Sequence, residues 1–149
     1  MATQTDAAVK APVHLWVVGI VSLLWNAYGA FDYTMTELGN RAYLTSMGFG
    51  DEALAYIAAL PAWAVAGWAI GVWVSLAGAI LLLLRSRFAA PAFLLSLAGA
   101  LVSFCYQFTS DAPASFTSGI NAAIPVVILI VIVAQWYYAR RMTAAGVLR

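Results

Sequence analysis

Residues 53–84 read ALAYIAALPAWAVAGWAIGVWVSLAGAILLLL and contain no Asp, Glu, Lys or Arg. Three further charge-free runs cover residues 11–31, 88–110 and 112–139. An α-helix rises about 1.5 Å per residue, so about 20 apolar residues cross a hydrocarbon core about 30 Å thick. Each of these runs is long enough for that crossing. The sequence therefore predicts an all-α membrane protein, built as a bundle of four transmembrane helices.

The composition agrees with a chain that lies mostly in lipid. Of its 149 residues, 64% are hydrophobic and 9% are charged, and the mean hydropathy is +0.91. A typical soluble domain has about 25% charged residues. The formal charge of +1 gives no basic excess, which counts against a nucleic-acid partner. We expect a single membrane domain over residues 1–149, surrounded by the lipid bilayer.

The predicted spans cover residues 13–33, 61–84, 88–108 and 119–138. Pro61 suits the start of the second span, because proline's missing N–H is not needed at a first helical position. Residues 51–60 begin with two acids and place apolar residues on one helical face, which predicts a short interfacial helix on the outer side between spans 1 and 2. The first run is too long for a signal-peptide core and contains Trp25 and Asn26, so we favour an uncleaved span over a cleaved leader.

Charge differs between the two sides of the predicted bundle. With four spans, both chain termini and the 85–87 link share one side, which holds every Lys and Arg except Arg41. The opposite side holds most of the acids, namely Asp32, Glu37, Asp51, Glu52 and Asp111. Cytoplasmic loops are enriched in Lys and Arg. We therefore predict that the N- and C-termini are cytoplasmic.

Several polar and aromatic residues fall in the outer half of the predicted spans. They are Trp25, Asn26, Tyr28, Asp32, Gln107 and Asn121. If they converge, they form a shallow outer cavity that suits a neutral hydroxylated ligand, because amides and aromatic faces recognise such groups better than ions. The competing interpretation is structural, with Asn26 as a hydrogen-bond link between helices and the others solvated near the interface.

A stripe of small residues runs along the second span at four-residue spacing, and it consists of Gly67, Gly71, Ser75 and Ala79. Small side chains let transmembrane helices approach closely. The stripe predicts close packing, either on the third span or on a second copy of the chain. We favour the third span, because the short 85–87 link makes spans 2 and 3 an antiparallel hairpin.

Few residues suggest cofactor or catalytic chemistry. His14 is the only histidine, and it is a weak candidate ligand for a metal or a haem, since a two-histidine haem would need a second chain. The lone Cys105 has no partner for an internal disulfide. No acid or base lies near the predicted midplane, which counts against a proton or sodium relay. With no nucleophile–base pair and no metal cluster in the sequence, we expect neither an enzyme nor a cofactor.

The segments His14-Leu-Trp16, Leu24-Trp25-Asn26-Ala-Tyr28-Gly29-Ala-Phe31-Asp32-Tyr33 and Pro61-Ala-Trp63 resemble a group of short four-span bacterial proteins. Members of that group often carry the loose label "sugar transporter", and the likeness extends from His14 to about Gln107. The resemblance implies a multi-pass protein of the bacterial cytoplasmic (inner) membrane with a transport-like role. It carries over no substrate site.

Two functions remain open, and a third is weaker. The first is an oligomeric facilitator of a neutral polar, sugar-like solute, because four spans are too few to enclose a pathway alone. The second is a non-catalytic accessory subunit that packs against a larger membrane complex through its apolar and aromatic helices. The third is a pigment- or haem-binding membrane protein that uses His14.

Overall fold

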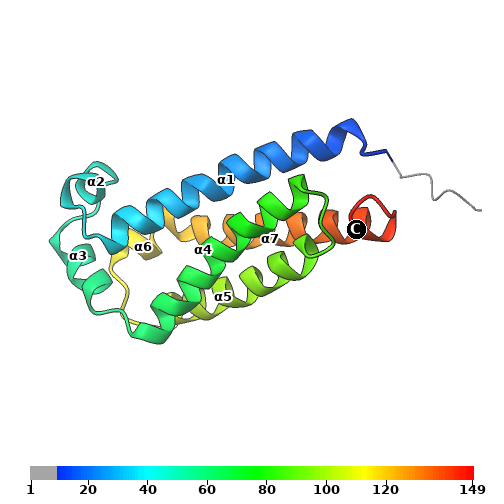
Figure 1. The fold of residues 1–149 in the computed structure, drawn as a ribbon. Helices are drawn as coiled ribbons and strands as arrows, with labels where there is room; N and C mark the ends of the chain where they lie inside the picture. Colours follow the sequence, from blue (N-terminus) through cyan, green and yellow to red (C-terminus); the bar gives the residue numbers. More distant parts are fainter. Residues whose placement is uncertain (1–9) are drawn as a thin grey trace, which may run out of the picture.

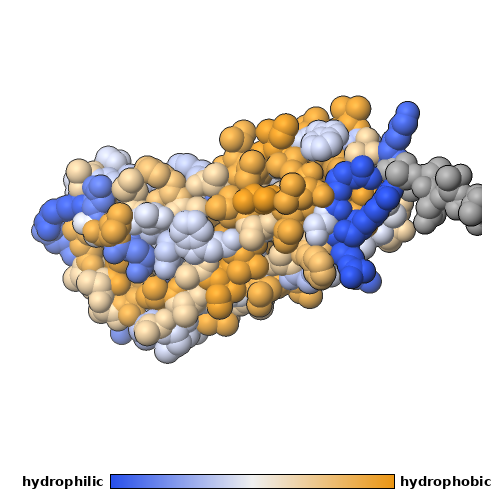
Figure 2. Space-filling view, viewed as in Figure 1, coloured by the Kyte–Doolittle hydropathy of each residue, from blue (hydrophilic) through white to orange (hydrophobic). Residues whose placement is uncertain are grey.

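The computed structural model describes residues 10–149, and all regular secondary structure in that range is helical. Four helices are long and apolar enough to cross a membrane, and they are α1 (Val13–Glu37), α4 (Ala62–Leu83), α5 (Ala89–Thr109) and α7 (Gly119–Ala144). Figure 2 shows hydrophobic residues over the middle of the visible face and hydrophilic residues at both ends. The predicted four-helix membrane bundle is confirmed, and the chain is a multi-pass integral membrane protein.

The four spans pack in the order α1, α4, α5, α7. The closest pair is α4 and α5, while α1 packs against α4 and α7 packs against α5. The first and last helices in this order, α1 and α7, make little direct contact with each other. Figure 1 shows that α1 begins and α7 ends at the same end of the bundle, which we call the terminal end, and that the short helices lie at the opposite, loop end.

The hydrophobic core is concentrated near the terminal end. Leu15 of α1, Leu82 of α4 and Phe93 of α5 are fully buried there, together with Ala139 of α7. Val147 and Leu148, which follow α7, are buried in the same cluster. All four spans are therefore joined at this end.

The link between α4 and α5 is held by the last residues of the chain. Arg85 adopts a left-handed backbone conformation with φ of 59°, which reverses the chain direction within a few residues. The N–H of Arg87 donates to the carbonyl of Arg149 at 3.0 Å, and the N–H of Arg149 donates to the carbonyl of Arg85 at 2.8 Å. The segment after α7 is thereby fixed against the α4–α5 link.

The short helices all lie between spans. The short helix predicted between spans 1 and 2 is present as α3 (Asp51–Ala58), which begins after Gly50 and has Asp51 and Glu52 in its first turn. Two further short helices, α2 (Arg41–Ser46) and α6 (Ala114–Thr117), were not predicted. Two spans are also longer than predicted, because α1 continues to Glu37 and α7 continues to Ala144.

Candidate functional site

Asn26, the polar residue deepest in the predicted outer cluster, has its partner within its own helix. Its side chain is 6% exposed, and its Nδ2 donates to the carbonyl oxygen of Ser22 at 2.8 Å. Asn26 shares a buried face of α1 with Gly19, Ser22 and Ala30. Because α4 is the span that packs on α1, the amide is held inside the bundle without bonding to another helix.

Asp32 and Asn121 are engaged in local contacts at the loop end. The hydroxyl of Tyr43 in α2 donates to Asp32 Oδ1 at 2.7 Å, and Asn121 Nδ2 donates to the carbonyl of Ser115 at 2.8 Å. Burial, followed by the hydrogen bond to Asp32, raises the pKa of Tyr43 above its ordinary value. Its hydroxyl therefore stays protonated at neutral pH and remains the donor. These contacts fix the loop-end segments to the spans.

The rest of the predicted outer cluster is spread over different helices. Trp25 and Tyr28 are exposed on α1, at 43% and 57% respectively, and Gln107 is half-buried on α5. None of the hydrogen bonds between described residues joins two members of the cluster. Tyr28 and Asp32 both interact with Tyr43. Of the six predicted residues, Trp25 is the one that lines either of the two cavities described below.

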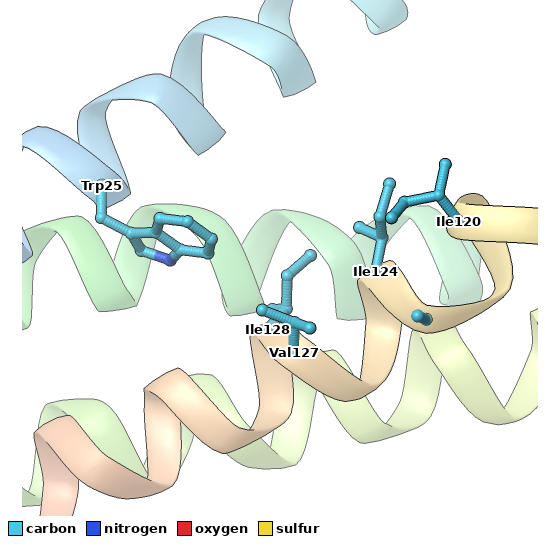
Figure 3. Close-up of a pocket in the computed structure, with 6 residues that line it drawn as sticks. Trp25, Ile120, Ile124, Val127 and Ile128 are labelled. Carbon is cyan, nitrogen blue, oxygen red and sulfur yellow. The ribbon is translucent and has the colours of Figure 1, made fainter.

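Trp25 instead forms part of an apolar groove between α1 and α7, which we call the α1–α7 groove. It encloses about 140 Å³ and is lined by Trp25, Ile120, Ala123, Ile124, Val127 and Ile128. Figure 3 shows Trp25 directed from α1 toward α7, with the labelled side chains of α7 directed back toward α1. The groove exists because α1 and α7 stand at the two ends of the packing order and make little contact with each other along this part of their length.

Gln135 lies further along α7 than the residues that line the groove, on a similar side of the helix. It was not predicted as a site residue. It follows Ile124 and Ile128 by 11 and 7 residues, and such spacings return to the same side of a helix. Exposure along this face falls from 46% at Ile124 to 5% at Gln135. The Gln135 Oε1 atom is buried and has no hydrogen-bond partner among the described residues. Gln135 does not line the groove itself, and its amide is buried further along α7.

His14 and Tyr138 close this side of the bundle at the terminal end. Nδ1 of His14 lies 2.6 Å from the hydroxyl of Tyr138, a hydrogen-bonding distance, and the two rings pack edge to face. This contact joins α1 to α7 where the hydrophobic core is thickest. Within residues 10–149, no group of three His, Cys, Asp or Glu side chains could hold a metal ion.

A second cavity lies where α1 ends and α4 begins, and we call it the loop-end pocket. It encloses about 300 Å³. Its lining comes from α1, α2, α3, α4 and their connections, and consists of Thr36, Glu37, Gly39, Leu44, Leu54, Ile57, Ala58, Leu60 and Val65. Ligand sites are commonly apolar cavities of at least this size with a few polar groups. The sequence offered one signal for it, the long connection between spans 1 and 2 with its amphipathic second half.

The loop-end segments are held in place by polar and aromatic contacts. Arg41 and Asp51 form an ion pair between the starts of α2 and α3. The hydroxyls of Tyr56 and Ser110 are hydrogen-bonded at 2.7 Å, which ties α3 to the end of α5. Phe49 stacks on Phe116 of α6 with ring centroids 4.8 Å apart. These contacts join α2 to α3, α3 to the end of α5, and the connection between α2 and α3 to α6.

The small-residue stripe of α4 lies against α5. A Cβ atom at Gly67 would lie 3.0 Å from the carbonyl oxygen of Gly99, and one at Gly71 would lie 3.2 Å from the backbone nitrogen of Ala100. Ser75 and Ala79 are buried on α4 as well. The Ser96 hydroxyl also donates to the carbonyl of Gly71 at 2.6 Å. Gly67 and Gly71 are therefore in contact with α5 within the same chain.

Comparison of the chain with known protein families, with curated proteins and with solved structures finds no match.

Proposed function

We propose that this protein is a non-catalytic accessory subunit of a bacterial inner-membrane complex, and that a transmembrane helix of its partner packs into the α1–α7 groove. The observation that carries the proposal is the groove itself, an opening lined by apolar side chains between two spans that do not close on each other. In the proposed orientation the arginine-rich terminal end faces the cytoplasm, because Lys and Arg are enriched on that side of membranes.

The packing of α7 supports this function. Only four of its 26 residues are buried, Pro125, Ile132, Gln135 and Ala139, whereas the shorter α4 buries seven. Helices associate in membranes mainly through van der Waals packing and occasional polar contacts. A partner helix in the groove would cover the isoleucines of α7 and the Trp25 ring.

Filling the groove from within the chain should release the partner. Ile124 is 46% exposed in the groove and Leu95 is 55% exposed on α5, outside the groove. Both side chains can be enlarged without entering the core. We expect Ile124→Trp to lower recovery of the partner about tenfold or more when tagged protein is purified in mild detergent, whereas Leu95→Trp leaves recovery unchanged. The measurement is quantitative mass spectrometry of the co-purified membrane proteins.

Each outcome of this purification decides the proposal. A stoichiometric membrane partner that depends on Ile124 supports it. Recovery of the chain alone at native expression level, or a partner that Ile124→Trp retains, overturns it.

A second candidate function is an oligomeric facilitator of a neutral, sugar-like solute. The observation that favours it is the inward position of Asn26 and Gln135, which are 6% and 5% exposed inside a lipid-embedded bundle. Such amides could line a path if several copies rearranged around it, and the resemblance to proteins labelled as sugar transporters agrees with that role.

Reconstitution tests the facilitator directly. Purified chain in liposomes should increase the entry rate of a neutral polyol several-fold over empty liposomes, and Gln135→Leu should reduce that rate, because it removes the buried amide. Equal entry rates into protein-containing and empty liposomes would exclude this function for the chain alone.

A further inference from the structure

We propose that the loop-end pocket binds a small amphipathic organic cation, a protonated amine that carries a short aliphatic group. This inference concerns the loop end and does not depend on the partner proposed for the α1–α7 groove. It rests on the shape of the pocket, on a hydroxyl in its wall that makes no hydrogen bond with the described residues, and on the Glu37 carboxylate that lines it.

The hydroxyl of Thr36 is the polar group inside the pocket. Thr36 is 7% exposed and lines the cavity. Its hydroxyl makes no hydrogen bond with the described residues, whereas that of Thr34, two residues earlier, donates to the carbonyl of Ala30. The Thr36 oxygen is not fully enclosed, so a molecule in the pocket can reach it. A bound molecule that offers an N–H group would give the Thr36 oxygen a partner.

The one charged side chain that lines the pocket is negative. It is Glu37, the last residue of α1. The pocket also adjoins the C-terminus of α3 and the N-terminus of α4, whose partial charges have opposite signs, so the Glu37 carboxylate is the charge that a ligand meets. The one basic residue of the loop end, Arg41, is paired with Asp51. A positively charged group is therefore favoured near Glu37.

The remaining wall of the pocket is aliphatic. Leu44 is 2% exposed, and Leu54, Ile57 and Leu60 line the cavity beside it. The volume of about 300 Å³ corresponds to about ten water-sized groups. That space accommodates an ammonium group together with an alkyl chain of a few carbons.

The same lining disfavours other small ligands. An anion would be repelled by Glu37. A sugar would leave most of its hydroxyl groups against leucine and isoleucine side chains, where they lack partners. A fully apolar molecule would leave the Thr36 hydroxyl unpaired. An alkylammonium ion places its charged end near Thr36 and Glu37 and its chain against the aliphatic wall.

Calorimetric titration with n-pentylammonium chloride tests this inference. The full-length protein is placed in nanodiscs of zwitterionic lipid, and the signal from empty nanodiscs is subtracted to remove partitioning into lipid. We expect saturable binding with a Kd of about 1 mM or tighter. Glu37→Gln should weaken it about tenfold or more, and Thr36→Val about threefold.

Matched probes and a matched variant decide the outcome. 1-Pentanol and sodium pentanoate have chains of the same length, and we expect both to bind at least tenfold more weakly. Glu52→Gln removes an exposed acid of α3 that does not line the pocket, and it should leave binding within twofold. Pentanol binding as tight as pentylammonium, Glu37→Gln binding like the unaltered protein, or an unsaturable titration would each overturn the inference.

Discussion

Replacing Phe93 by alanine is expected to lower the free energy of unfolding by about 3–5 kcal/mol. Phe93 is fully buried in the cluster that joins all four spans at the terminal end. Its ring lies against Gly78 of α4, where an added Cβ atom would be 3.0 Å from Cε1 of Phe93. The neighbouring glycine has no side chain to move into the vacated space. Most of the lost packing contacts would therefore remain as a cavity.

Phe108 provides the matched control on the same helix, because it is 53% exposed. Unfolding in mixed micelles, followed by circular dichroism as the fraction of denaturing detergent rises, measures both variants. We expect Phe108→Ala to unfold within about 0.5 kcal/mol of the unaltered protein. Equal midpoints for the two alanine variants would contradict the view that the terminal-end cluster stabilises the bundle.

Gly99→Val is expected to be the most disruptive change outside that cluster, with a cost of about 3 kcal/mol or more. A Cβ atom at Gly99 would lie 2.7 Å from the carbonyl oxygen of Gly67 and 2.8 Å from the backbone nitrogen of Gly71. Both are backbone atoms of α4, so no side-chain rotation can relieve the clash. The two helices must separate, which also breaks the hydrogen bond from Ser96 to Gly71.

Gly29→Val is the control, because no atom lies within 4 Å of a Cβ at that position. Both variants add the same side chain to a glycine within a span. Size-exclusion chromatography and thermal unfolding in detergent should show a loss of folded protein for Gly99→Val alone. A Gly99→Val protein that melts with the unaltered one would show that α4 and α5 are not in close contact.

The spans were predictable because composition alone decides them. A charge-free run of more than 20 residues has few alternatives to crossing a membrane, and four such runs give four helices. Helix α3 was predictable from Gly50 and the acids that follow it. Helices α2 and α6 span six and four residues, which is too short for a periodic pattern, so their formation depends on tertiary contacts such as those of Tyr43 and Phe116.

The candidate sites were less predictable, because they depend on which helices are neighbours. No local sequence pattern indicates that α1 and α7 stay apart, so the α1–α7 groove could not be predicted. Gln135 precedes Trp136 and Tyr137 in a segment that resembles an interfacial aromatic belt. A buried amide was therefore not expected at this position. Thr36 and Glu37 line a pocket only because α2 and α3 fold over them, and no local sequence pattern predicts that arrangement.

The hydrogen bonds between Arg149 and the α4–α5 link have a practical consequence for labelling the protein. Any polypeptide attached after Arg149, whether natural or added as a reporter fusion, starts from an anchored residue whose backbone is already paired. A bulky fusion there would pull directly on the turn that joins the two most closely packed spans. Insertion at Gly48, which is exposed between α2 and α3, leaves that turn undisturbed.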